Sequence, residues 1–369
     1  MKTNIYRANL LKGIKVASRA VTTKAAMPIL ASLKIESDAG KLKLTGNNLE
    51  LGIETSVDAV VLESGGFCVD ARLFAEVIAK LPESEVNLST AKNQLHIKCE
   101  KSEFKLPIKE DTSEFSSLPK VEETGNVEIS ELTMKDMIRQ TIFCTSDNEA
   151  QKMMAGIHME VKSNALTFCA LDGHRIAQRK VDLAGSNSDC EMTIPGKSLA
   201  EVSKIMAGEA DKKVRIAFNE KLACFFMEET KIITRLIEGK YFDVKRMMTL
   251  SGDIRITANR NDLISVIDRA SLLIQETDKK PMIFKAKDRL YVELKSGLGS
   301  MKEELEIEKE GEDITIGLNH RFMMEALRAI DDENVTMCMI NSKNPCVIKG
   351  ENYIYIVLPI TIKSNEAAA

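Results

Sequence analysis

The chain contains the sequence ARLFAEVIAKL from Ala71 to Leu81, directly followed by Pro82. Apolar residues such as Phe74 and Ile78 return there every three or four positions, which is the pattern of a helix that buries one face. Proline cannot continue a helix, so Pro82 marks the end of this one. The segment is one of a set, and the spacing of the set predicts the architecture.

Helical signals come in pairs, and the pair recurs three times. The predicted helices begin near Ala8, Ala71, Glu131, Lys197, Arg260 and His320. The first members of the pairs lie about 123 and 129 residues apart and the second members about 126 and 123, a period that indicates copies of one domain rather than a solenoid of small repeats. A chain of 369 residues is long enough for three domains with their own cores.

Each repeat has the same order: a helix, a set of short strands, a second helix and more strands. The connections between strands are too short for βαβ crossovers, so we expect an α+β fold with antiparallel sheets. Charged or glycine-containing linkers near 119–126 and 251–252 separate the repeats. The predicted domains are therefore 1–122, 126–250 and 251–369.

Composition restricts the class of protein. The eight cysteines are scattered singly, with no Cys-x-x-Cys and no short Cys/His cluster, so we predict reduced thiols and no metal site. Polar residues 2–4 follow Met1, and no stretch approaches the eighteen or so apolar residues of a membrane span. The expectation is a cytoplasmic protein without a membrane segment, a metal or a cofactor.

Positive charge is concentrated on the predicted helices, although the formal net charge of the chain is −4. Residues 8–24 carry four lysines and arginines and no acid. For any one helix, a solvated face is as good an explanation as a binding surface. The recurrence of the bias on equivalent helices favours a shared role, and neutralising a phosphate backbone without reading bases is the obvious one. The candidate DNA-facing residues are Lys12, Lys24, Arg72, Lys135, Arg139, Lys197 and Lys204.

Motifs of known catalytic sites are missing. The sequence has no GxxxxGK[ST], no HExxH and no GxSxG. The four histidines are well separated, and we expect them at the surface or at strand edges rather than in a catalytic role. The prediction is that the protein is not an enzyme.

The densest local motif is ALDGHRIA at 170–177, between two strand-like runs. A hairpin accounts for Asp172 and Gly173, because a tight turn requires positive backbone angles, but it does not require His174 and Arg175. Four further motifs accompany it in order: MPIL at 27–30, GNNLE at 46–50, EGKYFD at 238–243 and VLPI at 357–360. With these motifs the chain resembles, over its whole length, the bacterial DNA polymerase III beta subunits, a family of sliding clamps.

The resemblance implies a head-to-tail homodimer, a closed ring of six similar domains with helices lining the hole and sheets outside. Such a ring encircles duplex DNA without sequence preference and tethers a replicative polymerase. The implied partners are duplex DNA, a second copy of the chain, the replicative polymerase subunit, the clamp loader and repair proteins with clamp-binding peptides. The implied location is the bacterial cytoplasm, at the nucleoid.

The family pattern also implies two sets of site residues. The implied peptide pocket consists of Met154, Leu171, Gly173, His174, Arg175, Ile176, Phe242, Met247, Asn319, Phe322, Ile356, Leu358, Pro359 and Ile360. The implied dimer interface consists of Phe104 and Leu106 at one end and Leu272 and Leu273 at the other. An apolar groove with few polar groups suits an extended peptide with hydrophobic anchors. Without the resemblance, residues 358–360 read as an ordinary last strand.

The chain departs from the family pattern at several of these positions. Thr361 stands where arginine is common, Phe242 where proline is common and Leu171 where a small hydroxyl residue is common. Lys152 and Met153 replace an aromatic pair used on DNA. Three alternatives stay open: a DNA-binding scaffold that forms no ring, a divergent second-copy clamp that serves repair, and an enzyme with a site assembled from scattered acids.

Overall fold

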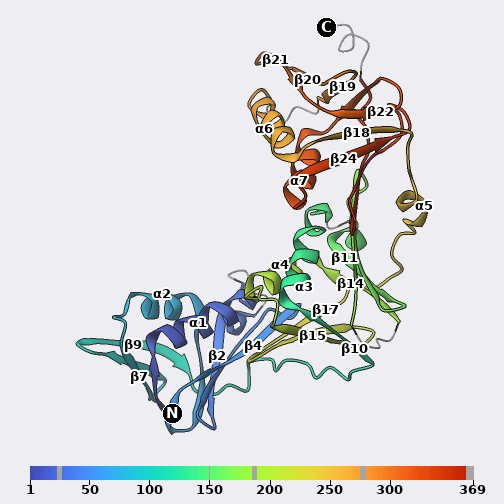
Figure 1. Cartoon of the computed structure of the whole chain (residues 1–369). Helices are drawn as coiled ribbons and strands as arrows, with labels where there is room; N and C mark the ends of the chain where they lie inside the picture. The colour runs from blue at the N-terminus through green and yellow to red at the C-terminus, as the bar shows by residue number, and fades with distance from the viewer. Residues whose placement is uncertain (23–26, 149, 185–188, 275–279, 363–369) are drawn as a thin grey trace. The chain divides into compact units, whose positions relative to one another are not determined.

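The computed structural model describes residues 1–22, 27–148, 150–184, 189–274 and 280–362 (Figure 1). The chain folds into two compact units. Unit 1 consists of residues 1–134 and 197–236, and unit 2 consists of residues 135–196 and 237–369. Each unit is therefore built from two stretches of chain, and the middle of the sequence contributes to both.

All six predicted helices are present, each beginning within one residue of the expected position. The α-helices are α1 Arg7–Ala17, α2 Ala71–Lys80, α3 Glu131–Arg139, α4 Gly196–Ile205, α5 Lys245–Met248, α6 Arg260–Ser271 and α7 His320–Ala329. The single turn α5 was not predicted, because four residues are too few to show a helical period. Short 3-10 turns add η1 Ser18–Ala20, η2 Pro28–Ala31, η3 Ile142–Cys144 and η4 Lys152–Ala155.

Side-chain caps explain where three of these helices begin. Asp70 accepts a hydrogen bond from the backbone N–H of Leu73 at 2.7 Å, at the start of α2. Asn259 and Asn319 accept equivalent bonds at the starts of α6 and α7. Each cap satisfies donors that the first turn of a helix leaves unpaired, and its loss costs about 1 kcal/mol.

Unit 1 contains one long antiparallel sheet. In spatial order its strands are β10 Gly125–Ser130, β15 Lys213–Phe218, β16 Leu222–Met227, β17 Thr230–Arg235, β4 Leu51–Asp58, β3 Lys41–Asn47, β2 Ser32–Asp38, β6 Gly65–Asp70, β9 Ser102–Lys109, β8 Gln94–Cys99, β7 Glu85–Ala91, β1 Lys2–Tyr6 and β5 Val60–Glu63. Within this sheet, β6 and β5 are the first and last of six consecutive strands, yet only one residue separates them in the chain. The six strands must therefore curl round until β5 lies near β6. The sheet thereby encloses a core instead of lying flat.

The helices α1 and α2 lie side by side over this sheet (Figure 1). Leu10 and Ile14 of α1 and Phe74 and Ile78 of α2 are fully buried among the strands. Burying each such side chain stabilises the fold by about 1.5–3 kcal/mol. Gly46 in β3 is required here, because a Cβ at this position would lie 2.1 Å from the carbonyl oxygen of Ala17 at the end of α1.

Unit 2 contains two sheets. The larger has the order β14 Cys190–Pro195, β11 Gly156–Lys162, β12 Ala165–Leu171, β13 Arg175–Asp182, β26 Tyr353–Val357, β25 Cys346–Lys349, β24 Asn334–Met339, β18 Ile254–Asn259 and β22 Glu308–Glu310. The smaller has the order β21 Ser300–Leu305, β20 Leu290–Lys295, β19 Met282–Ala286 and β23 Ile314–Leu318. The helices α6 and α7 lie side by side (Figure 1). All strand pairs between described residues are antiparallel, as predicted.

The larger sheet of unit 2 joins strands that lie far apart in the sequence. Strand β13 pairs with β26, with Ile176 opposite Ile356. Residues 237–253 connect β17 to β18, and apolar residues of this connector, among them Tyr241 and Met247, pack on one face of the joined strands. The β13–β26 junction and the connector over it create the cavities described below.

Candidate functional site

The loop between β12 and β13 is the predicted Asp-Gly turn. Gly173 has a φ of +86°, and the backbone N–H groups of His174 and Arg175 donate to Asp172 Oδ1 at 3.0 and 3.1 Å. Beyond the loop, the N–H of Leu358 donates to the carbonyl oxygen of His174 at 2.9 Å. The loop thus holds Leu358, the first residue after β26, beside the motif at 172–175.

Arg175 is buried, with 8% of its surface exposed, and lies at the centre of a cage. Its Nε donates to Asp172 Oδ2 at 2.8 Å, and its other nitrogens donate to Glu325 and to the carbonyl oxygen of Phe143. The guanidinium carbon lies 4.4 Å from the centre of the Phe322 ring, a cation–π contact. Burial alone would lower the pKa of Arg175, but Cys144 and the carboxylates of Glu325 and Asp172 together outweigh it and the pKa is raised. Arg175 therefore supports this site and has no free charge for a ligand.

Eight of the fourteen predicted pocket residues line one cavity of about 80 Å³, which we name the Leu358 cavity. They are Leu171, Gly173, His174, Arg175, Ile176, Met247, Ile356 and Leu358. Strands β12, β13 and β26 supply its floor, and Met247 of α5 covers one side. The cavity is small and mostly apolar, which suits a hydrophobic side chain.

The other six predicted pocket residues do not line the Leu358 cavity. They are Met154, Phe242, Asn319, Phe322, Pro359 and Ile360. Phe322 lies over Arg175, and its ring stacks on His174 with centres 6.1 Å apart. Asn319 uses its side-chain oxygen as the cap of α7. The N–H of Ile360 donates to the carbonyl oxygen of Gly317, and Met154 packs beneath the connector.

Phe242 lies in a second cavity, of about 410 Å³, which we name the His158 cavity. Its lining residues are His158, Glu160, Thr167, Cys169, Gln178, Glu191 and residues 240–245, 248 and 249 of the connector. The His158 ring stacks on Tyr241 with centres 4.5 Å apart, and Phe242 meets Tyr241 edge to face. Burial lowers the pKa of His158 and raises that of Tyr241, so both side chains are neutral near pH 7.

The predicted DNA-facing residues differ in their surroundings. Lys12 and Lys197 are exposed, and within the described ranges neither forms an ion pair. Arg72 pairs with Glu76 at 2.9 Å, Arg139 with Asp136 and Asp331, and Lys204 with Glu201 at 2.7 Å. Exposed pairs of this kind contribute at most about 1 kcal/mol, so a phosphate can replace the carboxylate. Lys135 is partly exposed, and Lys24 lies outside the described residues.

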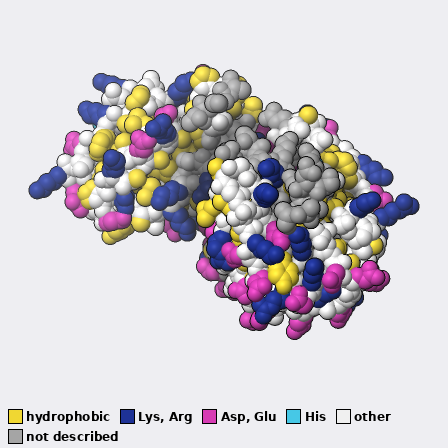
Figure 2. Space-filling view, turned by 90° about the horizontal axis from the view of Figure 1, so that it is seen from above, with side chains coloured by type: hydrophobic (Ala, Val, Ile, Leu, Met, Phe, Trp, Pro, Cys, Tyr) yellow, Lys and Arg dark blue, Asp and Glu magenta, His cyan; other side chains and the backbone are white. Residues whose placement is uncertain are grey.

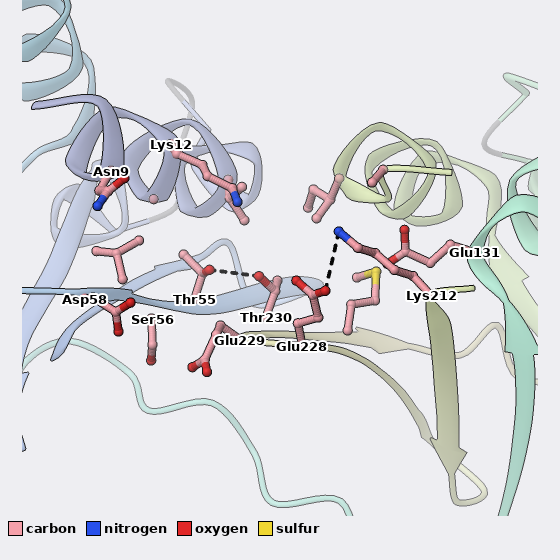
Figure 3. Close-up of a pocket in the computed structure, with 16 residues that line it drawn as sticks. Asn9, Lys12, Thr55, Ser56, Asp58, Glu131, Lys212, Glu228, Glu229 and Thr230 are labelled. Atoms are coloured by element: carbon pink, nitrogen blue, oxygen red, sulfur yellow. Dashed lines mark hydrogen bonds and ion pairs between the residues drawn. The ribbon is translucent and has the colours of Figure 1, made fainter. Parts of the chain in front are cut away.

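Lys12 stands at the edge of a polar cavity of about 300 Å³ in unit 1 (Figure 3). Thr55 and Thr230 hydrogen-bond across its floor at 2.8 Å, and Lys212 pairs with Glu228 at 3.4 Å. Acidic side chains outnumber the lysines on its wall, so the interior disfavours a phosphate. Elsewhere, on the face in Figure 2, lysines and arginines are interspersed with acids. A uniform basic field therefore does not cover this surface.

The predicted dimer residues lie on or near two strands with open edges. Among the described residues, 102–107 of β9 pair with β8 alone, because β6 reaches β9 only at Ile108 and Lys109, and β21 pairs with β20 alone. Phe104 is 40% and Leu272 is 78% exposed, so both side chains are accessible to a second copy of the chain. Leu273 is partly exposed, and Leu106 is buried in the core of unit 1.

The described residues contain no group of three or more His, Cys, Asp or Glu side chains placed to hold a metal ion. No helix in the described ranges is long and apolar enough to cross a membrane.

Comparison with known proteins decides the family. Models of the N-terminal, central and C-terminal domains of the DNA polymerase III beta subunit match residues 1–119, 128–243 and 245–360. The chain belongs to the DNA polymerase III beta subunit family. Among curated members, the beta sliding clamp of Staphylococcus epidermidis is 31% identical over 98% of this chain and 99% of its own length.

Solved structures of clamps have the same fold. A protein from Eubacterium rectale, provisionally described as a DNA polymerase III beta subunit, is 40% identical, with a TM-score of 0.93 over 98% of this chain and 99% of its own. The DNA polymerase sliding clamp of Bacillus subtilis is 26% identical, with a TM-score of 0.94 over 98% and 100%. The α+β clamp fold predicted from the sequence is therefore confirmed.

Two residues that contact Arg175 are absent from the sites predicted from the sequence. Phe143 in η3 and Glu325 in α7 complete the cage of Arg175. Their positions carry no motif, and Glu325 reads as an ordinary i,i+4 partner of Arg321, with which it also pairs at 3.3 Å. Of the departures from the family pattern, Leu171 and Phe242 line the two cavities, whereas Thr361 and Lys152 are exposed.

Proposed function

We propose that this chain acts as a DNA sliding clamp: two copies close into a ring around duplex DNA and hold a replicative polymerase on its template. The observation that carries the proposal is the match of all three clamp-domain models, in order, along one chain. The proposal includes three clamp domains, 1–122, 126–250 and 251–369, and a location at the nucleoid in the bacterial cytoplasm. No catalytic step is assigned to the chain, because a ring acts by enclosing DNA.

Open strand edges support the ring. The free part of β9 in one subunit and the free edge of β21 in the next are both available for antiparallel pairing. Pairing would remove two edges that otherwise invite aggregation, and a head-to-tail contact that closes makes a ring.

A clamp loaded onto nicked circular DNA by a clamp loader is expected to stay bound and to dissociate once the DNA is linearised. The predicted DNA-facing lysines and arginines can contact phosphates but belong to no base-reading element. Direct affinity should therefore be weak and fall with salt, by about 0.9 log unit per log unit of salt for each phosphate contact. Gel filtration of labelled clamp with the plasmid measures retention.

Linear DNA with blocked ends is the control, and it should retain the clamp as circular DNA does. Lys12→Ala combined with Lys197→Ala should weaken direct binding, whereas Lys343→Ala, at an exposed lysine of unit 2, should not. Equal retention on open linear and circular DNA would exclude sliding as the mechanism.

We further propose that the Leu358 cavity and its surrounding residues receive peptides from the polymerase, the clamp loader and repair proteins. Leu358→Ala or Met247→Ala should weaken binding of a short hydrophobic polymerase-derived peptide by about 1–3 kcal/mol, because a few buried anchors carry such interfaces. Met248→Ala is a matched control, since this neighbour on α5 lines the His158 cavity instead. Titration calorimetry measures the difference, and unchanged affinity in both Leu358→Ala and Met247→Ala would place the peptide elsewhere.

A further inference from the structure

The Leu358 and His158 cavities lie on the same face of the same sheet. Along β12, Thr167, Cys169 and Leu171 alternate with residues of the other face, so their side chains point the same way. Thr167 and Cys169 line the His158 cavity, and Leu171 lines the Leu358 cavity. The nearest lining residues of the two cavities on this strand, Cys169 and Leu171, are thus one two-residue step apart, roughly 7 Å. The connector lies between them, with Met247 facing one cavity and Met248 the other.

The two cavities are close together but differ greatly in volume. The Leu358 cavity, at about 80 Å³, has room for little more than one small apolar side chain. Binding sites for small ligands are typically about 300–1,000 Å³, and the His158 cavity, at about 410 Å³, falls within that range. A peptide anchored at Leu358 therefore has a larger unfilled space one step away.

The His158 cavity combines neutral polar groups and aromatic rings with charged side chains, which are Glu160, Glu191, Lys240, Asp243 and Lys245. Thr167 offers a hydroxyl and Gln178 an amide, and His158 is neutral near pH 7 because burial lowers its pKa. Tyr241 and Phe242 supply ring faces and edges. The remaining charged lining residues carry both signs, so they favour neither an anion nor a cation. This combination suits an aromatic side chain with a polar tip, whose ring packs while its hydroxyl finds a partner.

We propose that the His158 cavity is a second anchor site for the peptides that bind at the Leu358 cavity, and that it receives a tyrosine-like side chain. This inference rests on the proposed function, because it assigns a further contact to the same partners. Two residues of extended chain span about 7 Å, and crossing the connector takes one or two more. The second anchor therefore lies about two to four residues from the apolar one.

The test compares a short hydrophobic polymerase-derived peptide with the same peptide extended by Gly-Gly-Tyr at either end. Calorimetry with the full chain should show one extension binding about tenfold more tightly, whereas Gly-Gly-Ala adds nothing. Gln178→Trp places a large ring in the cavity, where it competes with the tyrosine, and should cancel the gain while leaving the affinity of the short peptide unchanged. Lys180→Trp places the same residue on the same face of β13 but outside both cavities, and it should keep the gain.

Methionine methyl NMR of the unsubstituted chain gives a readout that needs no cavity variant. The short peptide should shift the Met247 resonance, and the extended one should shift Met248 as well. Absence of a gain with either extension, or a gain that survives Gln178→Trp and is lost in Phe322→Ala, would overturn the second anchor while leaving the proposed function intact. Failure of the short peptide to bind would overturn both.

Discussion

Replacing Leu272 and Leu273 with aspartate is expected to convert the dimer into monomers while both units stay folded. Leu272 is 78% exposed in the single chain and Leu273 partly exposed, so neither is needed for the core. In the proposed ring they pack against the β9 end of the next subunit. Losing about 3 kcal/mol of apolar burial at one interface weakens it about 100-fold. A two-subunit ring has two such interfaces, so dissociation should become about 10⁴-fold more favourable.

Native mass spectrometry at micromolar concentration, with circular dichroism to confirm folding, measures this result. Ile340→Asp is the matched control, because Ile340 is an exposed apolar residue of the same unit that was not assigned to the interface. Phe104→Asp, on the opposite side of the same interface, should also produce monomers. Leu106 is not a suitable position for this test, because it is buried in the core of unit 1 and its substitution would destabilise the fold. A wild-type chain that is already monomeric at this concentration would contradict the ring.

Arg175→Ala is expected to lower the free energy of unfolding of unit 2 by about 3 kcal/mol and to abolish peptide binding. The substitution leaves the side chains of Asp172 and Glu325, which are 14% and 30% exposed, without their shared cation. Removing one partner of a buried ion pair costs about 3–5 kcal/mol, and the partial exposure of Glu325 places the expected value at the lower end. The β12–β13 loop would also lose the bond from Arg175 to Glu325 of α7. This loop supplies part of the lining of the Leu358 cavity.

Urea denaturation followed by tyrosine fluorescence measures this effect, because the chain has no tryptophan and four of its five tyrosines belong to unit 2. Arg289→Ala is the control: Arg289 also pairs with two carboxylates, Glu304 and Glu306, but in an exposed position. Its loss should cost less than about 1 kcal/mol. Arg175→Lys should recover only part of the stability, since an ammonium cannot reproduce the planar fork. Equal destabilisation by Arg175→Ala and Arg289→Ala would show that the cage has no special role.

The sequence by itself determined the six longer helices, the fold class and the family. Helical periodicity and caps are local, because a residue such as Asp70 bonds to the backbone three positions ahead. The six paired helices could therefore be predicted from the sequence, with first residues that are correct to within one position. The five motifs that carry the family resemblance are likewise contiguous stretches. The three-domain division and the roles of the site residues stay predictions.

Only the tertiary structure decided which strands meet and what spaces they leave. Ile176 lies opposite Ile356, and Ile53 of β4 opposite Ile232 of β17, although each pair is far apart in the sequence. These ladders merge segments of different repeats into continuous sheets and group the contacts into two compact units. They also place Phe242 in a different cavity from Leu358. Strand partners and cavity volumes depend on long-range packing, which leaves no periodic mark on the sequence.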